Sequence, residues 1–219
     1  MVNEMDAVKH ILNTYCDKPP VIIEAGCYDG AITKTLLSFI SRNPKVYVAF
    51  ECDPRSIGKI KANDFPKEAV LVEQALGNVD GQVDLYISEG VSAHNFVFDS
   101  SSSIRKPKQV TEDWTEIQFN FTYPVPCTKL DTFCRRASID TIDFIWADIQ
   151  GAEKDMVMGG LEMMKVTKFM YLEHSENREW YEGQWTLPEM VKDLKDLGFD
   201  VYKKFDCDII FYNTNIITL

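Results

Sequence analysis

Apolar and polar positions follow two different periods along this sequence. Near the N-terminus, Val8, Leu12 and Tyr15 recur at spacings of three and four, which predicts an amphipathic helix that the following prolines end. Short continuous apolar runs then alternate with further amphipathic segments. We expect strands at residues 21–23, 46–50, 69–72, 142–148 and 169–172, and helices at residues 32–40, 54–61, 129–137, 156–164 and 187–197. Continuous apolar strands separated by helices are typical of a parallel sheet with helices on both faces.

One stretch interrupts this alternation. Between residues 77 and 118 the periodic signal weakens, although Val83, Leu85 and Ile87 alternate with polar residues as in an antiparallel strand. A strand-like run resumes at residues 119–125. We therefore interpret residues 77–118 as an insertion between elements of the main sheet.

The C-terminal end predicts a hairpin. Residues 199–205 and 209–212 both have the composition of strands, and the few residues between them suit an antiparallel pair. No internal repeat and no boundary to a second domain is visible. We expect one α/β domain over residues 1–219, with an N-terminal helix within residues 1–18.

Composition limits the class of protein. Of the 219 residues, 45% are hydrophobic and 26% are charged, which suits a single globular core. Lys and Arg number 23 against 34 Asp and Glu, and the net charge of -11 disfavours a nucleic-acid partner. No apolar run is long enough for a membrane span and no secretion signal is visible, so we expect a cytoplasmic protein. The six cysteines lack the spacings of zinc sites and redox motifs.

A glycine-containing turn follows the first strand. It runs from Glu24 to Gly30 and lies where open α/β sheets bind ligands, at the carboxyl end of a strand. Gly26 and Gly30 would let a ligand approach the backbone, but their spacing differs from the G-x-G-x-x-G of dinucleotide-binding folds. A ligand without a pyrophosphate is therefore favoured, although strand-to-helix turns also use glycine for purely structural reasons.

Glu51 ends the second strand. In folds of this kind, a carboxylate at this place accepts hydrogen bonds from both hydroxyls of a ribose. Taken alone, an acidic residue after a strand is more often a helix cap or a solvated charge. Together with the glycine turn, Glu51 and the following Cys52 and Asp53 favour a nucleoside site.

Four segments occur together in a characteristic order. They are residues 24–30, 50–54, 75–77 and 143–153, and the run from Asp148 to Glu153 is the most specific of them. With these segments the chain resembles FkbM-type S-adenosylmethionine-dependent methyltransferases over residues 21–212. The resemblance implies a class I methyltransferase fold, in which a Rossmann-like sheet of seven strands is mostly parallel and its last strand is antiparallel. The hairpin predicted above agrees with that fold.

The resemblance also implies a cofactor and a reaction. The cofactor is S-adenosylmethionine, and the reaction is methyl transfer to a hydroxyl of a small-molecule or glycan acceptor, a sugar above all. The residues then expected to bind the donor are Glu24, Gly26, Cys27, Tyr28, Asp29, Gly30, Glu51, Cys52, Asp53, Ala75, Leu76, Ser103 and Asp148. Compared with the usual family pattern, Tyr28 stands in place of Asn, Cys52 in place of Pro and Trp146 in place of Lys. A methyltransferase for a non-carbohydrate metabolite and a noncatalytic nucleoside-binding domain are the alternatives.

Methyl transfer to a hydroxyl needs a base for the departing proton. Asp148 follows one central strand and Glu173 and His174 follow the next, so we expect these three side chains to face each other. His174 titrates near neutrality and could accept the proton directly. Alternatively, Asp148 and Glu173 hold a divalent cation such as Mg²⁺ that acidifies the hydroxyl. The sequence leaves both versions open, and a buried strand-end histidine is the structural alternative for His174.

Overall fold

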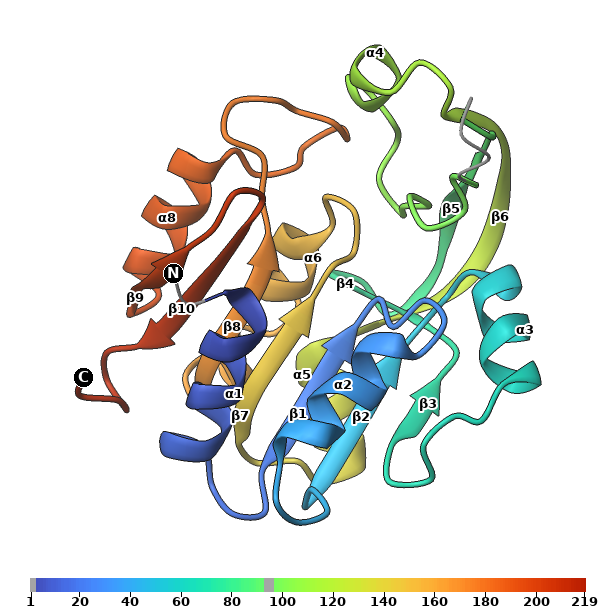
Figure 1. The fold of residues 1–219 in the computed structure, drawn as a ribbon. Helices are drawn as coiled ribbons and strands as arrows, with labels where there is room; N and C mark the ends of the chain where they lie inside the picture. Colours follow the sequence, from blue (N-terminus) through green and yellow to red (C-terminus); the bar gives the residue numbers. More distant parts are fainter. Residues whose placement is uncertain (1–2, 93–96) are drawn as a thin grey trace.

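Seven strands form the central sheet of the protein (Figure 1). The computed structural model describes residues 3–92 and 97–219, and within these ranges the strand order is β3-β2-β1-β7-β8-β10-β9. The strands are β1 (Val21–Ala25), β2 (Val46–Phe50), β3 (Val70–Val72), β7 (Ile142–Ala147), β8 (Thr167–Glu173), β9 (Phe199–Lys204) and β10 (Asp208–Asn213). Neighbours from β3 to β8 are parallel, whereas β10 is antiparallel to β8 and β9. The predicted Rossmann-like sheet, with its antiparallel C-terminal hairpin, is confirmed.

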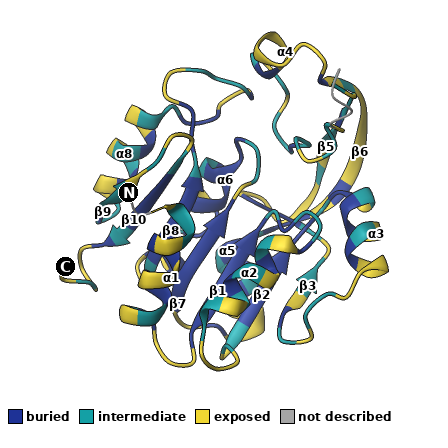
Figure 2. Cartoon of the chain, viewed as in Figure 1, coloured by how far each residue is buried: buried dark blue, intermediate teal, exposed yellow. Residues whose placement is uncertain are grey.

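Helices cover both faces of this sheet and create two apolar cores. One face carries α1 (Glu4–Thr14), α2 (Ala31–Phe39) and α3 (Pro54–Ala62), and the other carries α5 (Leu130–Ala137), α6 (Glu153–Met158), α7 (Leu161–Met164) and α8 (Leu187–Asp196). Strand alternation divides the side chains: Phe144 and Trp146 of β7 enter the first core, and Ile145 and Ala147 enter the second. The central strands are buried along their whole length, as Figure 2 shows. Double-sided burial explains their continuous apolar sequences.

A second, smaller sheet has three strands within the described ranges. It contains β4 (Ala75–Gly77), β5 (Gly81–Glu89) and β6 (Gln118–Lys129), in the order β4-β6-β5, and a short helix α4 (Val110–Asp113) lies between β5 and β6. β5 is antiparallel to β6, which confirms the strand predicted from Val83, Leu85 and Ile87. The chain then returns along β5, where Ser103 and Tyr86 exchange backbone hydrogen bonds of 2.8 and 3.1 Å. This return places the serine-rich residues 99–104 beside the carboxyl ends of the main sheet.

The prediction of a single helix over residues 156–164 is wrong. The segment forms two short helices, α6 and α7, with a break at Gly159. A Cβ atom on Gly159 would lie 2.0 Å from the carbonyl oxygen of Gly77. The backbone of Gly159 therefore packs directly on β4, and its carbonyl accepts a hydrogen bond from Asp131 N at 3.1 Å. The Asp131 carboxylate in turn accepts from the first backbone N–H groups of α7. Tertiary contact thus interrupts a segment whose periodicity is helical.

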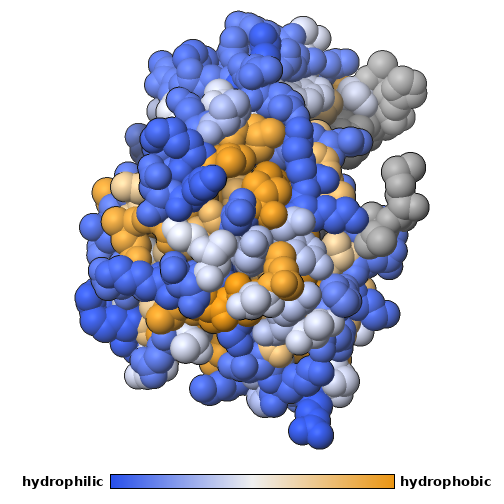
Figure 3. All heavy atoms as spheres, turned by 90° about the vertical axis from the view of Figure 1, so that its left-hand side faces the viewer, coloured by the Kyte–Doolittle hydropathy of each residue, from blue (hydrophilic) through white to orange (hydrophobic). Residues whose placement is uncertain are grey.

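The surface is mostly hydrophilic, in keeping with the acidic composition. On the face at the left of Figure 1, apolar side chains gather between polar surroundings (Figure 3). In the C-terminal segment, Ile216 and Leu219 are 41% and 57% exposed.

No helix in residues 3–92 and 97–219 combines the length and the apolar content needed to cross a membrane. The cytoplasmic location expected from the sequence stays a prediction.

The close approach at Gly159 gives a stability prediction. Gly159→Ala should lower the free energy of unfolding by about 1–3 kcal/mol, because the added methyl group forces β4 and α6 apart. Gly58→Ala is the matched control: Gly58 lies inside α3 and an added Cβ would meet nothing within 4 Å. That control should stabilise the protein by about 0.5–1 kcal/mol through helix propensity. Urea unfolding of both variants measures the difference, and equal stabilities would contradict the packing argument.

Candidate active site

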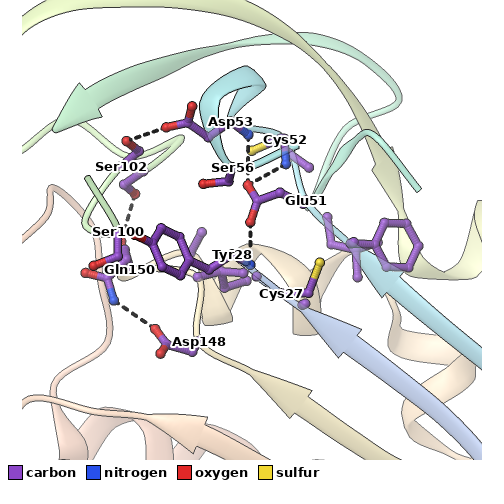
Figure 4. Close-up of a pocket in the computed structure, with 18 of the residues that line it drawn as sticks. Cys27, Tyr28, Glu51, Cys52, Asp53, Ser56, Ser100, Ser102, Asp148 and Gln150 are labelled. Carbon is purple, nitrogen blue, oxygen red and sulfur yellow. Dashed lines mark hydrogen bonds between the residues drawn. The ribbon is translucent and has the colours of Figure 1, made fainter. Parts of the chain in front are cut away.

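A cavity of about 400 Å³ lies at the carboxyl ends of β1, β2 and β7. Its volume is in the range of small-molecule sites, and residues 99–104 form part of its wall. Most of the residues predicted to bind a donor line it: Gly26, Cys27, Tyr28, Asp29, Glu51, Cys52, Asp53, Ala75, Leu76, Ser103 and Asp148. The structure thus brings together residues that are more than a hundred positions apart in the sequence, as Figure 4 shows for ten labelled side chains.

The glycine turn is held by backbone contacts. Gly26 has φ +82°, and a Cβ atom there would lie 2.0 Å from the carbonyl oxygen of Asp148. The backbone N–H groups of Gly26 and Cys27 both donate to the carbonyl of Phe50 at 3.0 Å. Only glycine combines this left-handed conformation with so close an approach. The turn is therefore fixed against the ends of both neighbouring strands, β2 and β7.

Two predicted site residues lie behind the cavity wall. Glu24 is fully buried, and its Oε2 accepts hydrogen bonds from Thr33 Oγ1 at 2.7 Å and from the Tyr47 hydroxyl at 2.6 Å. Burial raises the pKa of Glu24 to about 7. Gly30 has φ +81° and starts α2, where an added Cβ would meet the ring of Phe65 at 3.1 Å. Neither residue lines the cavity, and both support the turn from beneath.

Glu51 organises the loop that follows β2. Its carboxylate accepts three backbone N–H groups, from Tyr28, Cys52 and Asp53, each at 2.8 Å (Figure 4). Burial raises the pKa of Glu51 to about 7, although these three donors act in the opposite direction. A carboxylate has about four acceptor positions. Donors in the described part of the chain occupy three of these positions on Glu51, which leaves one that a ligand in the cavity could use.

Two polar clusters hold residues 99–104 against the cavity. In the first, Ser102 Oγ donates to Asp53 Oδ2 at 2.9 Å, and Arg55 donates to both of these residues. Burial alone would raise the pKa of Asp53, but hydrogen bonds from Arg55 and Ser102 hold it below its usual value. In the second, the hydroxyl of Tyr28 donates to Asp99 at 2.6 Å, and Lys59 contacts both.

The second cluster was not predicted from the sequence. Lys59 and Asp99 are 40 positions apart and carry no local motif, so only the fold brings them to Tyr28. Ser103 is placed by a further contact, since its Oγ donates to the carbonyl of Gln150 at 2.7 Å.

Asp148 lines one end of the cavity, and the carboxyl group of Glu173 lies behind it, outside the cavity lining. The Asp148 side chain is exposed to the cavity, and Gln150 Nε2 donates to Asp148 Oδ1 at 2.8 Å and to Glu173 Oε2 at 3.1 Å. Although Asp148 opens to the cavity, the surrounding protein keeps both carboxyl groups away from bulk water, and this desolvation raises both pKa values; in Glu173 the charge of Asp148 adds to the effect. The structure therefore joins Asp148 and Glu173, as predicted, through a glutamine that sequence analysis had not singled out. The position of Gln150 within the Asp148–Glu153 motif could have pointed to it in the sequence.

His174 does not join this pair. Successive residues of a strand point to opposite faces, so the side chain next to Glu173 is turned away from Asp148. The His174 side chain is buried, does not line the cavity, and has no hydrogen-bond partner for either ring nitrogen in the described part of the chain. Burial lowers its pKa. This geometry matches the alternative given above for His174, a buried histidine at the end of a strand.

A divalent cation is not supported at Asp148 and Glu173. Among residues 3–92 and 97–219, no group of three or more His, Cys, Asp or Glu side chains is arranged to hold a metal ion. The N–H groups of Gln150 also point at both carboxylates, where a cation would need oxygen ligands. The group formed by Asp148, Glu173 and the Gln150 amide is therefore better suited to exchanging a proton than to binding Mg²⁺.

Glu153 closes the motif loop from within the protein. It is 2% exposed, and its Oε1 accepts the backbone N–H of Ile149 at 3.0 Å. Burial raises the pKa of Glu153 to about 8. Its contact fixes the loop that carries Asp148 and Gln150, so its role in this structure is to shape the loop.

Comparisons with known proteins identify the family of the chain. The family described as "Methyltransferase FkbM domain" matches residues 24–201. The 2-O-methyltransferase NoeI of Sinorhizobium fredii (strain NBRC 101917 / NGR234) is 33% identical over 207 residues, which are 91% of this chain and 82% of that protein. The chain belongs to the FkbM methyltransferase family.

A solved structure supports the fold. The FkbM methyltransferase of Methylobacillus flagellatus KT aligns with a TM-score of 0.54 and 11% identity over 88% of this chain. The alignment covers 43% of the solved chain, so this chain spans less than half of that protein's length. At this identity the likeness shows the shared methyltransferase fold.

Burial of Glu153 gives a pH prediction. Its pKa is raised from 4.5 to about 8, so the folded protein keeps a proton that the unfolded chain releases, and stability falls as pH rises through this window. The glutamine of Glu153→Gln does not ionise in this pH range, and it keeps a side-chain oxygen that can accept the hydrogen bond from Ile149 N. The variant should gain at least about 1 kcal/mol relative to wild type between pH 5 and pH 8.

Urea unfolding at both pH values measures this gain. Glu162→Gln, at an exposed position, is the control and should show the same difference from wild type at both pH values. A Glu153→Gln difference that does not change with pH would show that the buried carboxyl is not protonated in the folded protein.

Proposed function

We propose that this protein transfers a methyl group from S-adenosylmethionine to a hydroxyl of a sugar or glycan. One observation carries the proposal: Glu51 and Asp148 line the same cavity, with the glycine turn between them. A carboxylate suited to ribose hydroxyls and a carboxyl pair suited to proton removal then serve one bound donor and one acceptor. Family membership supports the class of reaction.

The charges of the cavity suit a cationic donor. The ionisable carboxyl groups that line it are Asp29, Glu51, Asp53, Asp99 and Asp148. No Lys or Arg lines it within the described ranges, and the nearby Arg55 and Lys59 are paired with Asp53 and Asp99. A pyrophosphate would find no countercharge here, whereas a sulfonium would. Phe50, Leu76, Leu85 and Ile104 add apolar walls for a planar base.

The residues around Asp148 can remove a proton. When bound, the sulfonium of the donor supplies a methyl group that is already activated. Asp148 would accept a hydrogen bond from the acceptor hydroxyl and take its proton as the methyl group passes to the acceptor oxygen, so that the carbon–sulfur bond breaks and the sulfur is left as the neutral thioether of S-adenosylhomocysteine. Glu173 would share the proton with Asp148, and Gln150 would hold both carboxyl groups in place by donating a hydrogen bond to each. The glycine turn would align the donor with the acceptor oxygen, which is the main requirement for transfer from an activated group.

An uncharged hydroxyl is the acceptor that this end of the cavity favours. The charge of Asp148 raises the pKa of both Glu153 and Glu173, so the three acids lie close together, and in the described part of the chain Asp148 and Glu173 have no Lys or Arg partner. A phosphorylated acceptor would be repelled. The relative NoeI is called a 2-O-methyltransferase, which supports oxygen as the methylated atom.

Donor binding tests the Glu51 assignment. Glu51→Gln should weaken S-adenosylmethionine binding at least about tenfold, because a charge-assisted hydrogen bond is worth about 1.5–3 kcal/mol. Calorimetry measures the affinity, and the melting temperature of the free variant checks that the loop still folds. Glu73→Gln, at an exposed residue paired with Lys61 outside the cavity, should bind as the wild type does. Equal affinities of the two variants would remove Glu51 from the donor site.

Methyl transfer from labelled donor to a panel of acceptors tests the reaction. We expect methylated product with neutral glycosides and much less with the phosphates of the same sugars. Asp148→Asn should lower turnover by about a hundredfold or more while donor affinity changes little. Wild-type turnover in this variant at saturating acceptor would contradict the mechanism. Transfer only to non-carbohydrate hydroxyls would assign the acceptor to the alternative class, and no transfer at all would leave a binding domain.

A further inference from the structure

Gln150 lies between the two carboxyl groups and two neighbouring loops. We infer that it is a positioning residue: its side-chain amide keeps the Asp148–Glu173 pair ionised enough to act as the base at neutral pH. This inference rests on the proposed function and deepens it, since it assigns a task to a residue that lines the cavity but takes no part in the bonds made and broken.

The amide geometry fits this task closely. A side-chain amide nitrogen carries two hydrogens, and Gln150 Nε2 directs them to Asp148 Oδ1 at 2.8 Å and Glu173 Oε2 at 3.1 Å. The opposite end, Oε1, lies 3.4 Å from the hydroxyl of Tyr181. A flipped amide would set its oxygen against two carboxylates. The orientation with nitrogen toward the acids is therefore the one that the surroundings favour.

The backbone is shaped to hold this side chain in place. Gln150 has φ +54°, in the left-handed region that residues with side chains rarely adopt. Ser103 Oγ donates to its carbonyl at 2.7 Å, and the hydroxyl of Tyr181 donates to the carbonyl of Ser101 at 2.7 Å. Gly or Asn would suit this conformation better if the loop had no need of the side chain. The loop keeps a glutamine that reaches both acids.

Within the described part of the chain, no cation is paired with the two acids. The other titratable groups that face it are Glu153 of α6, Asp208 of β10, Cys207 before β10 and Tyr181 of the loop after β8. All of them are neutral or negative, and in the described ranges neither Asp148 nor Glu173 forms an ion pair. The two N–H groups of Gln150 are the donors that remain. Donors to the ionised form favour it, so their loss would let the pair hold its proton to higher pH.

The test is the pH dependence of methyl transfer. Gln150→Met keeps the length of the side chain and removes both donors, and Gln150→Glu replaces the donors with a further carboxyl group. The acidic limb of the profile of kcat/KM should move to higher pH by about one unit in Gln150→Met and further in Gln150→Glu. Turnover of Gln150→Met should recover at high pH, and donor affinity should change little in both variants.

Gln82→Glu is the matched control. Gln82 lies on the exposed face of β5 outside the cavity, and its replacement adds the same charge to the protein. Its pH profile should superimpose on that of the wild type. A shift there equal to the shift in Gln150→Glu would mean that net charge alone moves the profile, which would overturn the inference.

A second measurement separates this inference from the proposed function. Carbon-13 NMR of labelled Asp and Glu side chains follows the titration of the pair without any turnover. The titration should move upward by about one unit in Gln150→Met even if no acceptor is ever found. An unchanged titration, or a loss of activity that is equal at every pH, would overturn the role of Gln150. Wild-type protein that transfers no methyl group, with the titration shifted, would refute the proposed reaction alone.

Discussion

The contact between Gly26 and the carbonyl of Asp148 determines the rest of the site. An added Cβ would sit 2.0 Å from that oxygen, and Asp148 N donates back to the carbonyl of Ala25 at 3.1 Å. These contacts join the ends of β1 and β7, the two strands at the centre of the sheet. The glycine turn and the acidic motif therefore have one fixed separation. In the proposed reaction, a donor lying on the turn and a base on the motif loop would face each other across this junction.

Buried carboxylates shape the loops around that junction. Glu51 gathers three backbone N–H groups, and Glu153 takes one more at the start of α6. Each of these acids has a raised pKa because burial disfavours its charge. The same groups thus determine loop geometry and make the protein less stable as pH rises. A loop built in this way is rigid while its backbone donors and carboxylates stay together, which suits a site that must align two reactants.

Periodicity was enough to predict the main sheet but not the contacts between its loops. The buried strands have continuous apolar sequences, and Glu51 could be found from its place at a strand end. Lys59 and Asp99 have no such signal, because only the folded chain makes them neighbours of Tyr28. Strand alternation could have separated His174 from Glu173 in advance, since consecutive residues of a strand face opposite ways. The break at Gly159 depends on packing against β4, which no local pattern records.

One departure from the expected family pattern, Trp146, bears on the role proposed for Gln150. Trp146 stands two residues before Asp148, on the same face of β7, where the resemblance leads one to expect Lys. Instead of a cation, the structure has an indole stacked on the ring of Tyr171, with centroids 3.8 Å apart and planes 7° from parallel. Trp146 lines the same cavity as Asp148, and the stacked rings offer the acids no countercharge. Under the inference drawn above, the carboxyl groups would depend on hydrogen-bond donors instead. Gln150 supplies two such donors, and the motif loop is bent into an unusual backbone conformation at the residue that carries them.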